Sequence, residues 1–336
     1  MTTEKELPLV SIVTPVYNGE KFLAEAIESV LGQTYSNWEY TIVENCSRDR
    51  SLEIAQSYAV KDKRIRIYKN QELLPATENF NHTMHQISDS SKYCKVLHAD
   101  DLLFPECLAS MVEVAETYPT TGIISSYRLE GDRVRNDGIS YNVQFLTGRE
   151  VCRRTLMGGY FFVFGTPSSL LLRSDIVRLH DPFYTPRFLT DTEACFSVLK
   201  ESDFGFVHQV LIYTRLHGES MTSSVENLGM ALLGNLDMLI RFGGFYLNQD
   251  EYKACLNKRL HDYYRFLGVN LLQYRERNFW RHQEEYLASM GLSLNKSRTM
   301  LSAAGVFLEN ITRLEQYQRL FRRWFKKDIP ERDFRL

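Results

Sequence analysis

The first 130 residues alternate between short apolar runs and segments whose apolar residues recur at helical spacing. The runs are rich in Val, Ile and Tyr and are bounded by polar residues, which is typical of buried strands. Strands that alternate with helices are joined by crossover connections, so the pattern predicts an α/β fold with a mostly parallel sheet and helices on both faces. The expected strands are 10–16, 40–43, 65–68, 93–97 and 122–125, and the expected helices are about 22–31, 52–58 and 105–115.

The rest of the chain divides into three stretches. Residues 131–154 are polar and resemble loops, whereas 155–224 contain strand-like runs at 169–172 and 204–213 with a helix at 191–200 between them. After Ser224 the sequence favours helices and is nearly free of proline. We therefore expect two domains, at 1–224 and 225–336.

The composition excludes several classes of protein. Apolar residues make up 44% of the chain and charged residues 24%, as in a globular protein. The formal net charge of −2 argues against a basic nucleic-acid-binding protein, so no nucleic acid is expected as a partner. No apolar run reaches the roughly 18 residues of a membrane span, the N-terminus lacks the pattern of a signal peptide, and the six cysteines are widely spaced. We expect reduced thiols and a cytoplasmic chain.

Polar residues follow the expected strands at the edge where such sheets bind ligands. Asp100 and Asp101 come just after the run at 93–97. Two adjacent carboxylates at the end of a buried strand are costly without a cation or hydrogen bonds, and a divalent ion suits such ligands. Alternatively, the two aspartates cap the following turn. Neither G-x-G-x-x-G nor G-x-x-x-x-G-K-[ST] occurs, so a phosphate-bearing ligand would need a metal or basic side chains.

Four segments at the ends of the expected strands and in the first helix carry a further pattern. They are Ser11-Ile-Val-Thr-Pro-Val-Tyr-Asn-Gly19, Ile27-Glu-Ser-Val-Leu-Gly-Gln-Thr-Tyr35, Ile42-Val-Glu-Asn-Cys-Ser-Arg-Asp49 and Leu97-His-Ala-Asp-Asp-Leu-Leu-Phe-Pro105. Together they resemble glycosyltransferase family two, over about residues 8–220. The resemblance implies a GT-A fold, which is Rossmann-like, and an inverting enzyme that uses a nucleotide diphosphate sugar.

The resemblance also implies which residues hold the nucleoside. Pro15, Tyr17 and the pair Glu44-Asn45 match positions around the nucleobase, and Asn79 matches a position that reaches the nucleotide. The family usually has two acids where Glu44 and Asn45 stand. An asparagine can accept from a uracil imide and can also donate, so the base is open, with a uridine diphosphate sugar as the expected donor.

The metal site follows from the same resemblance. The family's D-x-D motif corresponds to His98-Ala99-Asp100-Asp101, with histidine where the first aspartate often stands. By this match Asp100 faces the ribose, Asp101 binds Mn²⁺ or Mg²⁺, and His98 is a packed side chain rather than a ligand. A divalent ion would stabilise the charge on the leaving diphosphate.

The expected catalytic base is Asp191, because the family carries its catalytic acid at the start of a helix at this point. Thr190 and Glu193 have the spacing of a capping box, which would give Glu193 a structural role. The alternative for Asp191 is that it only complements the helix dipole. Further on, Arg215-Leu-His217 resembles an Arg-x-His motif that folds over the diphosphate, which makes His217 a candidate metal ligand, and Gly165-Thr-Pro-Ser-Ser169 matches the acceptor side.

Residues 312–327 carry six basic residues and one acid, a net charge of +5, with Leu314, Tyr317, Phe321 and Trp324 at helical spacing. A basic amphipathic helix can lie on an anionic membrane, and it can also pack on the protein body. We therefore consider peripheral contact with the cytoplasmic membrane, which would suit an acceptor such as a lipid-linked or cell-surface glycan.

Two other functions fit part of the sequence. A non-catalytic module could bind a sugar nucleotide or glycan on the same fold, although the intact Asp100, Asp101 and Asp191 argue against it. A nucleotidyltransferase would bring a glycine-rich, basic signature near the first strand, where this chain has Pro15-Val-Tyr-Asn18.

Overall fold

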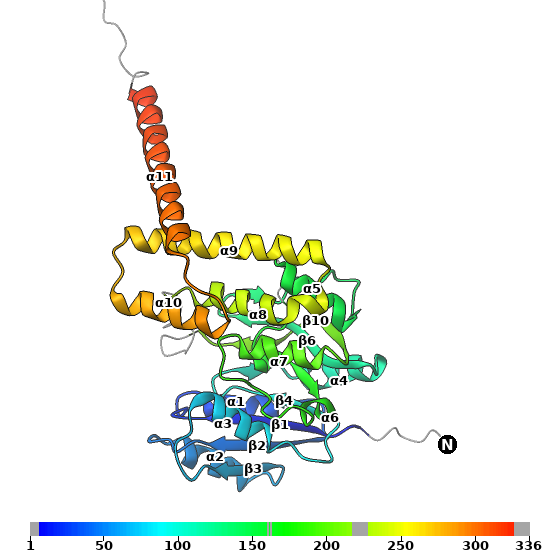
Figure 1. Ribbon diagram of the computed structural model, residues 1–336. Helices are drawn as coiled ribbons and strands as arrows, with labels where there is room; N and C mark the ends of the chain where they lie inside the picture. Colours follow the sequence, from blue (N-terminus) through cyan, green and yellow to red (C-terminus); the bar gives the residue numbers. More distant parts are fainter. Residues whose placement is uncertain (1–6, 160, 162, 217–227, 326–336) are drawn as a thin grey trace, which may run out of the picture. The chain divides into compact units, whose positions relative to one another are not determined.

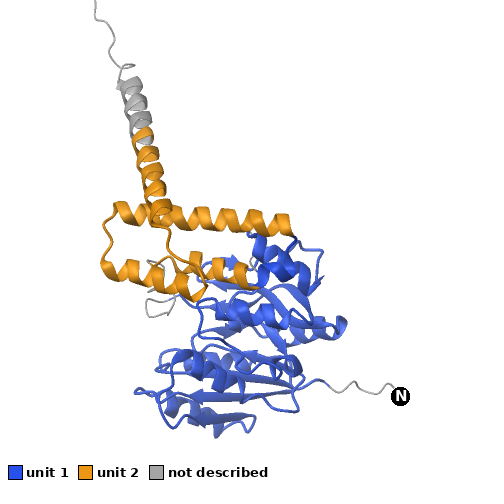
Figure 2. Ribbon diagram, viewed as in Figure 1, with its two compact units in different colours: residues 1–223, 242–248 blue, residues 224–241, 249–336 orange. Residues whose placement is uncertain are grey.

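The structure is a computed structural model that describes residues 7–159, 161, 163–216 and 228–325, with side chains up to Thr312. The chain divides into two compact units (Figure 2). Unit 1 comprises residues 1–223 and 242–248, and unit 2 comprises residues 224–241 and 249–336.

Unit 1 is built on a mixed, mostly parallel sheet with the strand order β3-β2-β1-β4-β9-β6-β10-β5 (Figure 1). β1 pairs in parallel with β2 and β4, and β6 pairs in parallel with β10. β9 lies antiparallel between β4 and β6. The strands are β1 (Val10–Val16), β2 (Trp38–Glu44), β3 (Ile65–Lys69), β4 (Tyr93–Val96), β5 (Leu102–Leu103), β6 (Thr121–Glu130), β7 (Arg133–Arg135), β8 (Phe145–Leu146), β9 (Leu171–Arg173) and β10 (Asp203–Thr214).

Helices cover this sheet, and the predicted GT-A-like architecture is confirmed. Alternate residues of a strand face opposite sides, so Val10 and Ile12 of β1 join a core with α1 and α4, whereas Ser11 and Val13 face the other way. The helices of unit 1 are α1 (Leu23–Leu31), α2 (Ser51–Ala59), α3 (Ala76–Met84), α4 (Cys107–Thr117), α5 (Gly148–Met157), α6 (Ser174–Val177) and α7 (Thr190–Val198).

The prediction that residues 131–154 form loops is wrong in part. This stretch contains β7, β8 and most of α5. The Thr147 hydroxyl caps α5 by accepting a hydrogen bond from the Glu150 N–H at 3.3 Å. α5 carries Arg149, Arg153 and Arg154 outside its buried positions. These charges make the stretch polar in composition, so the sequence analysis did not recognise the helix.

Unit 2 is helical, as the sequence predicts. Its helices α9 (Gln249–Leu272) and α10 (Arg277–Ser289) are joined by a hydrogen bond from the Tyr263 hydroxyl to Gln283 Oε1 at 3.1 Å. α11 (Lys296–Phe325) packs on α9, and α8 (Met230–Tyr246) begins in unit 2 and ends in unit 1. Within the described ranges, no helix combines the length and the apolar character that a membrane span requires.

Candidate active site

The ends of three parallel strands bring most of the predicted site residues to one edge of the sheet. Main-chain hydrogen bonds fix this alignment: the Asn45 N–H donates to the Val16 carbonyl and the Leu97 N–H to the Val13 carbonyl, both at 2.9 Å. The carboxyl ends of β1, β2 and β4 and the segments that follow them therefore lie side by side. They hold the predicted residues Pro15, Tyr17, Glu44, Asn45, Asp100 and Asp101.

The turns after β1 and β2 interlock. Asn18 and Cys46 adopt left-handed φ angles of 52° and 57°. The Asn18 N–H donates to Ser47 Oγ at 3.0 Å, and Asn18 Oδ1 accepts from the Arg48 N–H at 2.9 Å. A Cβ on Gly19 would lie 2.8 Å from Val16 Cγ2 and 3.4 Å from Ala99 Cβ. Glycine therefore suits this turn because a side chain would meet Val16, whereas the approach to Ala99 is an ordinary van der Waals contact.

The predicted nucleobase residues differ in how free their side chains are. Tyr17 is 44% exposed, so its ring is available to a ligand. Glu44 is buried, and its carboxylate accepts a hydrogen bond from the Ser47 N–H. The Asn45 amide faces the protein: Oδ1 accepts from Asn70 Nδ2 and from the Leu74 N–H, and Nδ2 donates to the Leu74 carbonyl, all at 2.9 Å. Asn45 therefore shapes the loop after β3, and its contact with a base stays a prediction.

Asn70 is a site residue that the sequence analysis missed. It follows β3 and is buried, and its Nδ2 group also donates to Asn79 Oδ1 at 2.9 Å. Asn70 thus joins Asn45 to the predicted nucleotide residue Asn79. The available signal was its place directly after a predicted strand, in line with Asn45.

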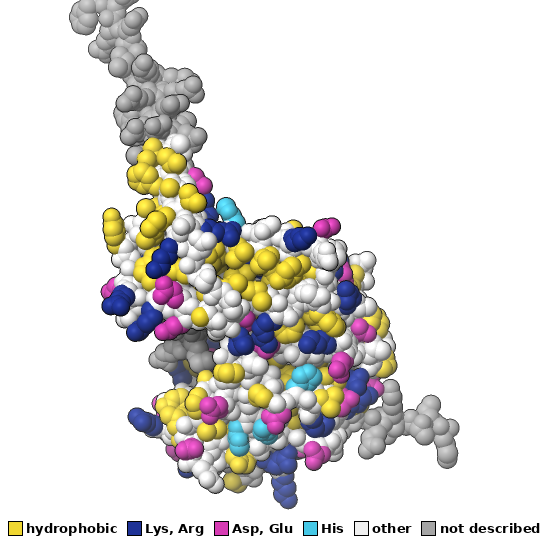
Figure 3. Space-filling model, in the orientation of Figure 1, with side chains coloured by type: hydrophobic (Ala, Val, Ile, Leu, Met, Phe, Trp, Pro, Cys, Tyr) yellow, Lys and Arg dark blue, Asp and Glu magenta, His cyan; other side chains and the backbone are white. Residues whose placement is uncertain are grey.

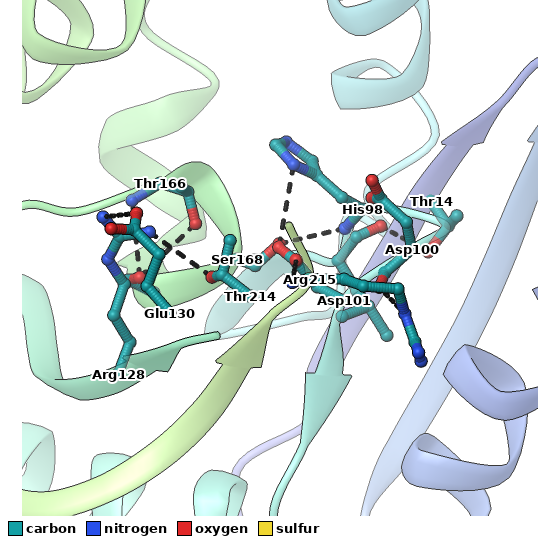
Figure 4. Close-up of polar contacts among 12 residues, drawn as sticks. Thr14, His98, Asp100, Asp101, Arg128, Glu130, Thr166, Ser168, Thr214 and Arg215 are labelled. Atoms are coloured by element: carbon teal, nitrogen blue, oxygen red, sulfur yellow. Dashed lines mark hydrogen bonds and ion pairs between the residues drawn. The ribbon is translucent and has the colours of Figure 1, made fainter. Parts of the chain in front are cut away.

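Asp101 is a deeply buried carboxylate at this edge, with 2% of its side chain exposed (Figure 4). Its Oδ1 accepts a hydrogen bond from the Arg215 N–H at 3.3 Å. Its buried Oδ2 has no hydrogen-bond partner within the described part of the chain. Burial raises the pKa of Asp101 above its ordinary value of 3.8, and the nearby His98 opposes the shift. A cation would bind at a buried carboxylate oxygen that has no hydrogen-bond partner.

Arg215 fixes the main chain of the two aspartates. Its Nε donates to the Asp100 carbonyl at 3.2 Å, and its Nη2 donates to Glu25 Oε2 at 2.8 Å. The guanidinium also lies 4.4 Å from the centre of the Phe22 ring. Arg215 therefore links β10 to the Asp100–Asp101 turn. His217, the other half of the predicted Arg-x-His motif, lies outside the described residues.

A buried lysine supports this turn from inside the sheet. Lys95 of β4 is fully buried, and its ammonium group donates to the carbonyls of Ser168 and Leu170 at 2.8 and 3.2 Å. The Ser168 hydroxyl accepts from the His98 N–H at 3.0 Å. Burial lowers the pKa of Lys95 below its ordinary value. The segment predicted to line the acceptor side is thus tied to the start of the metal motif, and the lone lysine within an apolar strand was the signal.

His98 lies near the predicted metal ligand Asp101 and acts electrostatically on the predicted catalytic base Asp191. Its Nδ1 lies 3.7 Å from Asp101 Oδ2, and its ring meets Phe80 edge-on with centroids 5.5 Å apart. Asp191 lies in the first turn of α7 and is partly buried. Burial raises the pKa of Asp191, and His98 opposes this shift too. The His98 imidazole therefore acts electrostatically on both carboxyls.

The predicted capping box at Thr190 and Glu193 is wrong. Leu189 occupies the N-cap of α7, and the Thr190 hydroxyl oxygen is buried without a hydrogen-bond partner in the described structure. Glu193 instead accepts a hydrogen bond from the Thr185 hydroxyl at 2.7 Å. Glu193 still has a structural role, because it ties the segment before α7 to the helix.

A second polar group lies beyond Ser168 in Figure 4, near Thr166. Arg128 donates to Glu130 Oε1 at 2.8 Å, and Arg135 donates to Glu130 Oε2 at 2.7 Å. The buried Arg128 Nε has no hydrogen-bond partner among the described residues. This N–H group could donate to a ligand on that side, and no motif in the sequence pointed to it.

The carboxylate set fits a metal held jointly with a ligand. Among the described residues, no three His, Cys, Asp or Glu side chains gather as a complete metal site. Asp101 offers one unpaired oxygen, so most of the coordination would come from diphosphate oxygens and water, as is usual for Mg²⁺ bound with a nucleotide.

The amino-terminal end of β4 offers a different pocket, of about 360 Å³. Its charged lining residues pair with one another, Lys92 with Glu116 and Arg173 with Asp175. This pocket lies at the opposite end of the strand from Asp101, and it lacks an unpaired acid.

Comparison with known proteins matches residues 11–177 to the family model described as glycosyl transferase family 2. The putative glycosyltransferase EpsE of Bacillus subtilis is 36% identical over 113 residues, which are 33% of this chain and 40% of that protein. The chain spans only part of the curated relatives that it matches, 40% of the length of EpsE and 15% of another relative.

Two solved structures share the fold. Residues 1–349 of S. aureus TarS, in complex with UDP-GlcNAc, match with a TM-score of 0.62 at 14% identity, over 84% of this chain and 80% of that one. The mannosyltransferase PcManGT from Pyrobaculum calidifontis, in complex with GDP-Man and Mn²⁺, matches with a TM-score of 0.54 at 14% identity, over 90% and 80%.

Proposed function

Because the chain belongs to glycosyltransferase family 2 and is a glycosyltransferase, we propose that it moves a sugar from a nucleotide diphosphate sugar to an acceptor hydroxyl, with inversion at the sugar carbon and with a divalent metal. The observation that carries this proposal is that Asp101 keeps a buried oxygen without a hydrogen-bond partner in the described part of the chain, while His98 acts electrostatically on both Asp101 and Asp191.

The proposed donor is a uridine diphosphate sugar. The TarS complex with UDP-GlcNAc supports this choice, since it contains that donor on the same fold. In this chain the exposed ring of Tyr17 would stack on the base, Glu44 and Asn45 would lie beside it, and Asp100 would face the ribose. Asn70 and Asn79 would hold the loop that closes this side of the site.

Asp101 would hold Mn²⁺ or Mg²⁺ through Oδ2. When bound, such an ion stabilises the negative charge that collects on the leaving diphosphate. Arg215 and the Lys95–Ser168 contact keep Asp101 in place, because each fixes main chain on one side of the aspartate turn. The Mn²⁺ complex of PcManGT supports a divalent ion on this fold.

Asp191 would take the proton from the acceptor hydroxyl as that oxygen attacks. Burial raises the pKa of its carboxyl, which makes the carboxylate a stronger base than an exposed aspartate. A single base and a direct displacement give inversion. His98 would limit the rise of the pKa, which favours the ionised form of Asp191.

The proposed acceptor is a sugar hydroxyl of a lipid-linked or cell-surface glycan. The Arg128 Nε–H group and Thr166 would face it, since both lie on the side of Ser168 away from His98 in Figure 4.

The test begins with a thermal-shift panel of uridine and guanosine diphosphate sugars, each with and without Mn²⁺, because a ligand of the native state raises its Tm. We expect one uridine donor to raise the Tm only with Mn²⁺, and the same donor to release uridine diphosphate when acceptor glycans are added. Donor binding without hydrolysis or transfer to any acceptor would instead favour a non-catalytic binding module.

A further inference from the structure

The exposed face of α11 carries a row of large apolar side chains. Met300, Leu301, Phe307, Leu308 and Ile311 are 66%, 75%, 54%, 61% and 38% exposed. Figure 3 shows hydrophobic side chains gathered on the described part of this helix. Contiguous apolar patches of this kind mark interaction sites, so this face of α11 calls for a partner.

α9 covers a different face of α11. Thr299, Ala303 and Val306 are buried there, and a Cβ on Gly268 of α9 would lie only 2.8 Å from the Ala303 nitrogen. α9 packs on α11 through these residues and through the ion pair between Arg265 and Glu309 at 2.7 Å, whereas residues 307–312 are all exposed and leave their apolar face open. Helices gain most of their stability from packing, so this open face of a 30-residue helix favours a further contact.

The apolar row continues along the sequence of α11 with a period of 3.5 residues. Steps of four and three residues lead from Met300 to Phe325, and seven of the eight positions are apolar. This is the a/d pattern of a coiled coil, sustained over more than three heptads. We call these positions the α11 seam: Met300, Ala304, Phe307, Ile311, Leu314, Gln318, Phe321 and Phe325.

The charges of α11 favour a second helix over a membrane as the occupant. In the heptad set by the seam, Arg313, Arg319 and Arg323 fall at the outer positions c, b and f, whereas Arg322 falls at e, beside the seam. Three of the four arginines between Thr312 and Phe325 are therefore at positions outside the contact of two paired helices. Gln318 is the one polar residue in the seam, and a single polar residue at an a position fixes register in paired helices. A membrane surface requires neither a 3.5-residue period nor such a residue.

We propose that the α11 seam pairs with the same seam of a second copy of this chain, as a parallel two-stranded coiled coil. Three phenylalanines from each helix, at roughly 150 Å² apiece, supply about 900 Å² of buried area. The aliphatic seam residues add to this, so the interface reaches the lower range of specific protein interfaces, near 1,200 Å². The pairing is independent of sugar transfer.

Sedimentation equilibrium on the full chain tests the pairing. We expect the wild-type chain to have the mass of two copies, and Ile311→Glu to weaken self-association about 100-fold, which is roughly 2.7 kcal/mol. The matched control is Thr312→Glu, which places the same charge on the next residue, outside the seam, and should keep the mass of two copies. Circular dichroism checks that both variants retain the wild-type helix content.

Cysteine cross-linking tests the parallel register. In parallel register Ile311 faces Ile311, so Ile311→Cys should form a covalent dimer under a mild oxidant, whereas Thr312→Cys and the wild type should not. A wild-type chain with the mass of one copy would overturn the proposal, and so would a dimer that Ile311→Glu leaves intact. A single-copy chain that floats with phosphatidylglycerol vesicles, and loses this binding with Ile311→Glu, would assign the seam to a membrane.

Discussion

The ammonium group of Lys95 lies 2.8 Å from the main-chain carbonyl oxygen of Ser168, inside the fully buried part of β4. Because the Ser168 hydroxyl accepts from the His98 N–H, this contact connects the sheet interior to the turn that holds Asp100 and Asp101. The buried Lys95 therefore has a positional role, because it fixes the predicted acceptor-side segment relative to the turn of the metal motif.

Replacing Lys95 tests that role. Lys95→Met removes both hydrogen bonds, and each carbonyl left unsatisfied costs about 1–3 kcal/mol, partly offset because the ammonium group is no longer buried. We expect a lower Tm and a larger fall in kcat than in donor affinity, measured by melting and by initial rates. Lys92→Met is the control, since the half-exposed Lys92 pairs with Glu116, away from the aspartate turn. An unchanged Tm and kcat in Lys95→Met would contradict the role.

Asp191→Asn should trade activity for stability. The proposed base is lost, so turnover should fall by about 10²–10⁴-fold while donor binding persists. At neutral pH the Tm should rise, because the folded protein no longer carries a buried carboxylate. This cost is present above the raised pKa of Asp191 in the folded protein. It is lost as the pH falls below 3.8, where Asp191 is protonated in both the folded and the unfolded protein. The gain in Tm should therefore vanish in acid, and a gain that persists there would have another cause.

The pH profile of kcat should report the same carboxyl. A base works when deprotonated, so kcat should rise with pH through a pKa above the ordinary 3.8 of aspartate. His98 lowers the pKa of Asp191, so His98→Gln should move this limb to higher pH. His85→Gln is the control, because His85 contacts the exposed Asp181. If this limb stays at the same pH in His98→Gln, His98 does not influence the pKa of Asp191.

Much of the fold follows from the sequence, since its signals are local. The runs at 10–16, 65–68 and 204–213 each match an observed strand within one residue at either end, because buried strands are short, apolar and bounded by polar residues. α5 was missed, because its charged exposed face outweighs its few buried residues. Its capping residues, Thr147 and Glu150, were the better signal.

The site is predictable only in part. The chain order of Asp100, Asp101 and Asp191 carries the family's pattern, and the parallel sheet places the first two at its ligand-binding edge. Long-range contacts are different: Lys95 with Ser168 and Asn45 with Asn70 join segments 73 and 25 residues apart. No local pattern specifies such pairs. The capping box at Thr190 was wrong because Glu193 bonds instead to Thr185, before the helix.

The most direct test of the account compares Asp101→Asn and Asp191→Asn, with donor binding by calorimetry and turnover measured on the same samples with and without Mn²⁺. We predict that Asp101→Asn loses the Mn²⁺-dependent part of donor binding, whereas Asp191→Asn binds the donor with Mn²⁺ as the wild type does and transfers sugar about 10²–10⁴-fold more slowly. Mn²⁺-dependent donor binding that survives in Asp101→Asn, together with wild-type turnover in Asp191→Asn, would contradict the account.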